Sequence, residues 1–287
     1  MNSFFKDILS SAIGVILALF MFIGSMFLLI TIGAFISTIF NKEGKVDPNS
    51  IIKIKFDYQI SDKPNDDPFS NFTPGGSFKS NNTRHLYKIL ESIESASNNK
   101  NVAGIVLDLE NFKSPGISSL KEIRDALKKF KKSDKFIYSY STLLSQTGYY
   151  LASVADSIFL YPTGVMELSG LSTTIPFFTE TMSEIGLKPE IIRHGKFKAA
   201  VEPFMLTKMS KENREQTTMF LDDIWMSMLQ DISQSRDITM DSLNILADNL
   251  LTSILPEKAV SAGLIDKLLY RDEFTSFLSK KLKQDED

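Results

Sequence analysis

The chain has 287 residues, a formal net charge of −3 and an apolar fraction of 43%. This length allows one large domain or two small ones, with enough apolar residues for a sizeable core. The acidic balance argues against nucleic acid as the main partner. The chain has no cysteine and only two histidines. Disulfides, thiol nucleophiles and zinc–thiolate or multi-histidine metal sites are thereby excluded, and nothing in the sequence implies a cofactor.

An uncharged apolar run from Ile8 to Phe40 is the clearest feature of the chain. A membrane span needs about 20 apolar residues, whereas a signal-peptide core has about 7–15. The run is too long for a cleaved signal, so it predicts an uncleaved transmembrane helix. One lysine precedes it and two follow closely, so charge alone does not set the orientation. We divide the chain into a cytoplasmic stub, anchor and linker over residues 1–45 and a domain over residues 46–287.

Strands and helices alternate along the first part of the domain. Residues 51–60 alternate apolar and polar side chains, as a half-buried strand does, and residues 61–82 have the composition of a long loop. Further segments have strand-like or helical patterns: strands over 102–109, 135–142, 157–163 and 189–194, and helices over 83–97, 118–132, 148–155 and 176–186. This alternation predicts an α/β fold with parallel strands and crossover helices.

Several helix ends are predicted from single residues. Ser119 and Glu122 form a capping-box pattern at the start of the 118–132 helix, and Gly186 is a helix stop. The last third of the chain is helical, with segments over 210–237, 240–251 and 256–263 and a charged helix at the end. Ser210 is the expected N-cap of the longest of these helices, and Pro256 lies at a first-turn position.

The stretch RHGKFKAAVEPF, residues 193–204, contains the strongest candidate for chemistry. A lysine acts as a general base only when its pKa falls from about 10.4 toward 7–8, which burial can achieve. The small residues Ala199 and Ala200 would let backbone crowd the Lys198 ammonium, and a helix start would disfavour its protonated form. An ordinary solvated lysine is the alternative, since most lysines are exposed. A triad using His194 is a weaker hypothesis, because no Gly-x-Ser-x-Gly turn presents a serine.

The segment from Gly195 to Phe204 closely resembles the lysine motif of the signal peptide peptidase family of the protease IV type. Further segments resemble the same family: IIKIKFDYQISDKP, VAGIVLDLENF, SQTGYYLASVADSIFLYPTGVMELSGL and AVSAGLIDKLL. The resemblance implies a Clp-protease/crotonase-like spiral of ββα units, preceded by one transmembrane helix. It also implies serine peptidase chemistry with a Ser–Lys dyad, in which Lys198 is the general base and Lys196 is dispensable.

The same resemblance implies the substrates, the cellular location and the partners of the protein. The substrates would be remnant signal peptides and other unstructured apolar peptides. The protein would lie in the bacterial inner membrane with its catalytic domain outside the cytoplasm. It would work as a homo-oligomeric ring or together with a second polypeptide.

The chain departs from the family pattern at the nucleophile. Long family members join a lysine-bearing half to a serine-bearing half, and this chain resembles the first. In LSQTGYY, residues 144–150, Gln146 takes the place of the nucleophile, and Ser145 is a weak candidate one residue away. Ser114-Pro115-Gly116 resembles a loop that supplies an oxyanion amide, which makes Gly116 a second weak candidate. The chain is therefore either the lysine-bearing part of a peptidase that needs a serine-bearing half, or a non-catalytic membrane scaffold that oligomerises.

Overall fold

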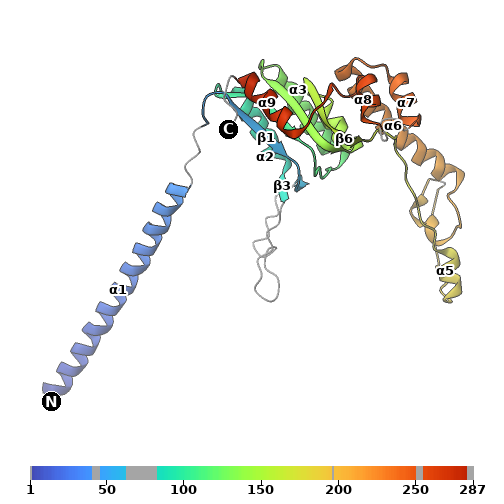
Figure 1. Ribbon diagram of the computed structural model, residues 1–287. Coiled ribbons are helices and arrows are strands. Elements are labelled where there is room, and N and C mark those ends of the chain that lie inside the picture. The colour runs from blue at the N-terminus through green and yellow to red at the C-terminus, as the bar shows by residue number, and fades with distance from the viewer. Residues whose placement is uncertain (1, 41–45, 63–82, 196, 250–254, 283–287) are drawn as a thin grey trace. The chain divides into compact units, whose positions relative to one another are not determined.

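The computed structural model describes the chain except for residues 1, 41–45, 63–82, 196, 250–254 and 283–287 (Figure 1). The chain forms two compact units, Met1–Val46 and Asp47–Asp287. Most of the predicted 61–82 loop and Lys196 lie outside the described residues. The roles assigned to residues 1–45 and 46–287 remain predictions.

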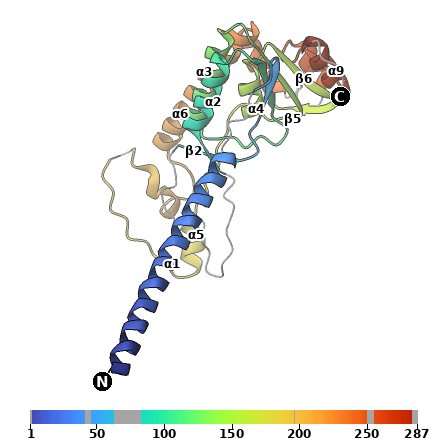
Figure 2. The same ribbon diagram turned by 90° about the vertical axis from the view of Figure 1, so that its left-hand side faces the viewer.

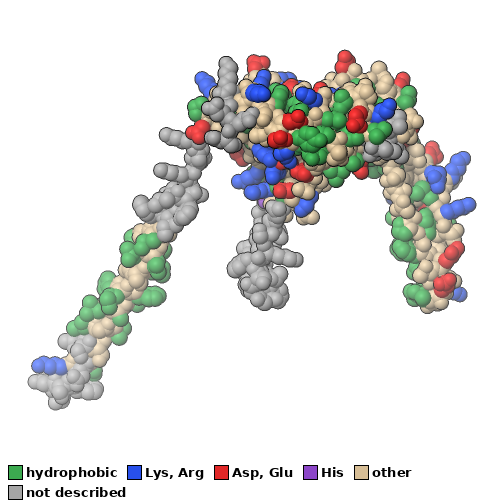
Figure 3. Space-filling view, viewed as in Figure 1, with side chains coloured by type: hydrophobic (Ala, Val, Ile, Leu, Met, Phe, Trp, Pro, Cys, Tyr) green, Lys and Arg blue, Asp and Glu red, His purple; other side chains and the backbone are tan. Residues whose placement is uncertain are grey.

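In the first unit the structure describes one helix, α1, from Asn2 to Phe40. Its Ser11–Gly33 part has a mean hydropathy of 2.8, and none of it is buried. The apolar side chains along it are visible in Figure 3. This is the one helix of the described residues that is long and apolar enough to cross a membrane. The structure thus has the predicted N-terminal apolar helix.

The second unit is built on a sheet of five parallel strands in the order β1-β4-β5-β6-β7. The bounds of these strands are as follows: β1 Ser50–Lys55, β4 Val102–Asp108, β5 Phe136–Leu144, β6 Ser157–Met166 and β7 Lys267–Leu268. Two short parallel strands form a separate sheet: β2 Gln59–Ser61 and β3 Thr83–His85. The predicted α/β class with parallel strands is confirmed.

Helices cover both faces of the main sheet. Their bounds are α2 Leu86–Asn98, α3 Ile117–Lys131, α4 Gln146–Ala152, α5 Thr179–Glu184, the 3₁₀ helix η1 Ala199–Phe204, α6 Lys211–Arg236, α7 Met240–Asn249, α8 Pro256–Ser261 and α9 Arg271–Leu282. Figure 2 shows α2 and α3 on one side of the strands and α9 on the other. Ser210 caps α6 as predicted, since its Oγ accepts from the Asn213 N–H at 3.1 Å.

Three of the predicted local features are wrong, and the first two lie in the early part of the domain. The 51–60 strand is divided into β1 and β2, because the buried Phe56 lies between them and its carbonyl accepts from the Lys113 N–H at 2.8 Å. The N-cap of α3 is Gly116 and not Ser119. The Ser119 hydroxyl instead donates to the Asp62 carboxylate at 2.8 Å, a contact across the fold that takes the place of the local cap.

The strand predicted over residues 189–194 is also wrong, because this segment has no strand partner among the described residues. The place next to β6 is taken by β7, which follows much later in the chain. Ile192 is fully exposed as a result. The preceding helix α5 is shorter than predicted, but Gly186 does end it, with φ of +75°.

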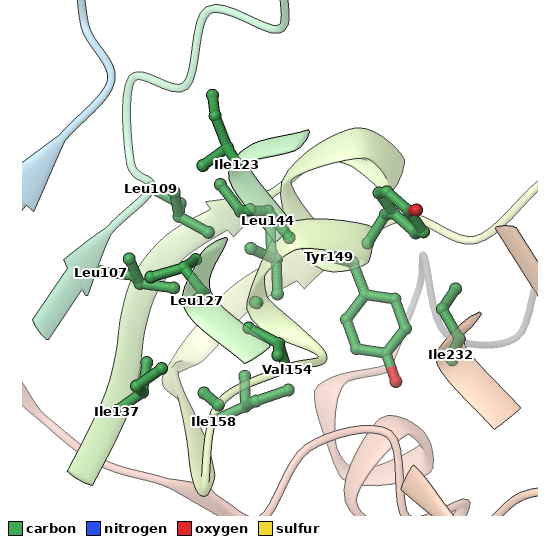
Figure 4. Close-up of a cluster of buried hydrophobic side chains, with 14 of the residues drawn as sticks. Leu107, Leu109, Ile123, Leu127, Ile137, Leu144, Tyr149, Val154, Ile158 and Ile232 are labelled. Carbon is green, nitrogen blue, oxygen red and sulfur yellow. The ribbon is translucent and has the colours of Figure 1, made fainter. Parts of the chain in front are cut away.

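The main core lies between the sheet and the helices on the α2–α3 side. It combines aliphatic residues of β4, β5 and β6 with residues of α3, α4 and α6 (Figure 4). Its labelled members are Leu107, Leu109, Ile123, Leu127, Ile137, Leu144, Tyr149, Val154, Ile158 and Ile232. A smaller aromatic cluster lies under α9, where the rings of Tyr140 and Phe274 stack at 4.7 Å. The apolar side chains on the two faces of the sheet therefore belong to two cores, a large one on the α2–α3 side and a small one under α9.

Arg124 of α3 is fully buried and joins three helices. Its guanidinium donates to the carbonyl of Tyr150 and the hydroxyl of Ser153 at the end of α4. It also donates to the carbonyl of Asp231 and the hydroxyl of Ser235 on α6, both at 2.7 Å. Since a guanidinium cannot lose its proton in a protein, its burial requires these acceptors to stay in place.

The Asp231 carboxylate completes this network. It accepts from the Tyr150 hydroxyl at 2.6 Å and from Lys121 and Lys128 at 2.8 and 3.3 Å. Burial would raise the pKa of Asp231, but the hydrogen bonds from Lys121 and Tyr150 and the charge of Arg124 outweigh it and lower the pKa to about 2. The carboxylate is therefore ionised at neutral pH and fixes the α3–α6 contact.

We expect Arg124→Ala to lower the free energy of unfolding by about 3–5 kcal/mol, because the variant leaves buried acceptors unpaired and opens a cavity. Urea unfolding of the full chain in detergent, followed by the fluorescence of its single tryptophan, Trp225, measures the loss. The matched control is Lys129→Ala, which removes an exposed ion pair with Glu94 and should cost less than about 1 kcal/mol. Equal losses in the two variants would contradict the prediction.

Candidate active site

The turn that follows β5 contains the weak nucleophile candidate. Ser145 is the N-cap of α4, and its Oγ accepts from the Gly148 N–H at 3.2 Å. A Cβ at position 148 would lie 3.1 Å from that Oγ, so glycine allows the close approach. The turn lies at the carboxyl end of a parallel strand, the usual place for ligand sites in α/β sheets. In this structure, however, the Ser145 hydroxyl serves as a helix cap.

Gln146, at the predicted place of the nucleophile, holds the loop that follows β6. Its Oε1 accepts from the N–H groups of Ser169 and Gly170 at 2.8 and 2.9 Å. Its Nε2 donates to the Gly170 carbonyl at 2.9 Å. Gly170 has φ of +83°, which few other residues adopt. All three hydrogen bonds join the start of α4 to the loop after β6, so the Gln146 side chain has a structural role here.

Gly116, the oxyanion candidate, is the N-cap of α3. Its carbonyl accepts from the Leu120 N–H at 3.0 Å, and the residue is exposed. Its φ of −56° is open to any residue, and a Cβ there would meet nothing within 4 Å. The conformation of this turn therefore does not require glycine.

Lys198 is the N-cap of η1, so the predicted position at a helix start is present. Its side chain is exposed, as is Ala200. The small neighbours therefore leave the ammonium open to water, and the described residues of this chain do not supply the expected burial. Lys198 lines an open cavity of about 640 Å³, whose other lining residues are Ile192, Arg193, His194, Phe197, Ala199, Ala200, Val201 and Gln216.

The structure does not join the three candidates in one site. The described lining of the Lys198 cavity includes neither Ser145 nor Gly116. The hydrogen bond of the Ser145 hydroxyl stays within its own turn, as described above. Lys198 is thus a lone candidate base, separate from the turn that resembles the serine motif.

Glu202 lies four residues after Lys198, and its role was not predicted from the sequence. It is fully buried, and its carboxylate accepts from the Ser210 hydroxyl, from the Ser210 N–H at 3.1 Å and from Asn213 Nδ2 at 2.9 Å. The Arg193 Nη1 atom lies 3.5 Å from Oε1 of the same carboxylate. Burial would raise the pKa of Glu202, but these hydrogen bonds and the Arg193 charge lower it overall.

The effect of Glu202 is to fix η1, and with it Lys198, to the first turn of α6. A carboxylate is favourable there because the start of a helix carries partial positive charge. The available sequence signal was the acid within the apolar AAVEPF segment, followed by the Ser210-x-x-Asn213 pair.

The chain is thus a protein with an apolar N-terminal helix followed by an α/β domain with a parallel sheet, in which Lys198 lies at the start of a short helix. The chain belongs to Peptidase family S49, whose profile matches residues 129–285, more than half of the sequence. The resemblance to signal peptide peptidases of the protease IV type is confirmed by this match and by individual relatives.

Three relatives illustrate the similarity. Protease 4 of Salmonella typhi is 34% identical over 158 residues, which cover 55% of this chain and 26% of that protein. Protease 4 of Haemophilus influenzae is 30% identical over 199 residues, covering 67% and 32%. The chloroplastic serine protease SPPA of Arabidopsis thaliana is 28% identical over 202 residues, covering 70% and 29%. The matched part of the chain thus spans about a third or less of each relative.

We expect Gln146→Ala to speed hydrogen exchange at the Ser169 and Gly170 amides by about tenfold or more, since each amide loses its acceptor. Hydrogen–deuterium exchange of the full chain, read by mass spectrometry over the segment after β6, measures the change. Thr147→Ala, on the next residue of α4, is the control and should leave this exchange rate unchanged. Unaltered exchange in Gln146→Ala would contradict the structural role.

Proposed function

We propose that this chain is the lysine-bearing part of a membrane-anchored serine peptidase with a Ser–Lys dyad. The neutral amine of Lys198 would take the proton of a serine hydroxyl as the serine oxygen attacks a peptide carbonyl. The resulting ammonium would then give that proton to the leaving amine. Backbone amides would hold the oxyanion.

The observation that carries this proposal is the position of Lys198 at the start of η1, on an open cavity whose lining is mostly apolar but includes Arg193, His194 and Gln216. Ile192 and Phe197 of this lining are exposed, at 101% and 58%. A second polypeptide over this surface would bury them and exclude water from the amine. Desolvation favours the neutral amine, the form that a general base needs.

The serine in this proposal comes from a second half or partner. Gln146 stands at the place of the nucleophile and is held by three hydrogen bonds, and Ser145 caps α4. A homo-oligomeric ring would also cover the Lys198 surface. The proposed substrates are remnant signal peptides and other unstructured apolar peptides, as the family resemblance implies.

A non-catalytic membrane scaffold is the second candidate function. It is favoured by the exposure of Lys198 and by the structural use of Gln146. A neighbouring coding region with an Ala-Ser-Gly-Gly-Tyr-Trp stretch would support the peptidase, because it would supply the serine half. A genome without such a stretch would favour the scaffold.

We place the anchor in the bacterial inner membrane and the domain outside the cytoplasm. The support is the apolar α1 and the family resemblance. We therefore expect protease added to intact spheroplasts to digest the domain while a cytoplasmic marker protein stays whole. A domain that is protected until the membrane is broken would mean the opposite orientation.

We expect Lys198→Ala to reduce peptide turnover by about 10²–10⁴-fold in a complex of the full chain with the serine-bearing half, because the general base is lost. Lys198→Arg should be as inactive, since a guanidinium stays protonated. Lys196→Ala is the matched control and should keep the wild-type rate. Turnover of apolar peptides by the purified complex in detergent is the measurement.

The full chain without its partner provides a further arm of this experiment. It should show no turnover and no labelling by a fluorophosphonate probe. Labelling at Ser145 would instead establish a nucleophile within this chain. If Lys198→Ala kept the wild-type turnover and Lys196→Ala lost it, the general base would be Lys196 and the assignment of Lys198 would be wrong.

A further inference from the structure

The first turn of α6 is capped from two places in the chain. Ser210 is its N-cap residue, and the Ser210 Oγ accepts from the Asn213 N–H at 3.1 Å. In an ordinary capping box, the third residue of the helix is a glutamate or glutamine that binds the N–H of the N-cap residue. That third residue is Asn213 here, and the Ser210 N–H donates instead to Glu202 Oε2 at 3.1 Å. Glu202 of η1 thus takes the place of the capping-box acid.

The donors around Glu202 hold its carboxylate in one place. Oε1 accepts from the Ser210 hydroxyl and lies 3.5 Å from Arg193 Nη1. Oε2 accepts from the Ser210 N–H and, at 2.9 Å, from Asn213 Nδ2. The side chain is fully buried, and a buried carboxylate is costly unless it is paired and hydrogen-bonded. Separation of η1 from α6 is therefore unfavourable for both elements.

The other side of η1 is joined to the start of α5. The Pro203 carbonyl accepts from the Phe178 N–H at 2.7 Å. The carbonyl of Leu206, just after η1, accepts from the Thr179 hydroxyl at 2.6 Å. The short helix is thus held on both sides, and Glu202 supplies its contact with α6.

Lys198 follows the position of η1 because it is the N-cap of that helix. It lies four residues before Glu202, which is little more than one turn of a 3₁₀ helix. Its cavity is lined by residues of both elements, among them Ala200 of η1 and Gln216 of α6. Movement of η1 along α6 would therefore displace the Lys198 amine. A general base must lie within hydrogen-bond reach of the proton that it takes, and a misplacement of about 1 Å can cost about 100-fold in rate.

We propose that Glu202 is a positioning residue for Lys198, and that its carboxylate, bound to the first turn of α6, sets the rate at which Lys198 takes a proton from the serine. This inference rests on the proposed function of Lys198 as the general base. Glu202 acts through the backbone of η1 and does not exchange a proton in the reaction. Its charge is essential and not only its size, because donors of Ser210, Asn213 and Arg193 surround it.

The test is a cycle of variants in the complex of the full chain with the serine-bearing half. Glu202→Gln replaces one acceptor oxygen by a donor, so kcat should fall by about 10- to 100-fold while KM changes by less than about twofold. Asn213→Asp alone sets two carboxylates against each other and should lower kcat as strongly. The double variant again pairs one amide with one carboxylate, and its kcat should return to within about threefold of wild type.

Two further measurements separate position from chemistry. The pH dependence of kcat in Glu202→Gln should keep its wild-type shape at a lower plateau, because Lys198 is still the base. In the full chain without its partner, the amides of Met205 and Leu206 donate to the Glu202 carbonyl at 3.1 and 2.9 Å. Their hydrogen exchange should be about tenfold faster in Glu202→Gln and should slow again in the double variant. Glu215→Gln, at an exposed carboxylate of α6, is the control and should change neither measurement.

Failure of this inference can be told apart from failure of the proposed function. The inference alone is overturned if Lys198→Ala loses turnover but Glu202→Gln keeps the wild-type rate. Losses in Glu202→Gln and Asn213→Asp that add in the double variant, or unchanged hydrogen exchange in Glu202→Gln, would overturn it as well. Wild-type turnover in Lys198→Ala would overturn the proposed function and this inference with it.

Discussion

The buried guanidinium of Arg124 holds together parts of the chain that the sheet alone does not connect. Its acceptors come from the end of α4 and from α6, and the charge cannot be relieved by deprotonation. If α6 moved away, the guanidinium would remain in the core with half of its partners lost. The penalty for an uncompensated buried charge therefore fixes α6 on α3 and α4, and Asp231 strengthens the same contact through Tyr150 and Lys121.

The position of Lys198 depends on that helix. Glu202 binds the first turn of α6 through Ser210 and Asn213, so η1 is fixed to a helix that Arg124 fixes to the core. The candidate base is thus held through its backbone while its side chain stays in water. The same part of the chain exposes Phe178 and several other apolar residues. Exposed apolar surface of this kind is typical of interaction sites, and it supports the proposal that a second polypeptide covers Lys198.

The fold class was largely predictable because its signals are local. The uncharged run of α1, the apolar run of β4 and the helical spacing of α6 with its Ser210 cap are all properties of neighbouring residues. The exceptions arose where a distant partner competed with a local signal. Ser119 has the sequence of a capping residue, but Asp62, 57 residues earlier, takes its hydroxyl. Apolar content over residues 189–194 suggested a strand, but β7 pairs with β6 and that segment is left without a neighbour.

The sequence by itself determined the family, the N-terminal apolar helix, the parallel α/β class and the place of Lys198 at a helix start. These follow from composition, periodicity and contiguous motifs, which need no knowledge of distant contacts. Tertiary structure decided that Gln146 holds the loop after β6, that Glu202 anchors η1, and that Lys198 is solvated in this chain. Burial and hydrogen bonding depend on which segments meet in space, and a side chain's chemical role depends on those surroundings as much as on its identity.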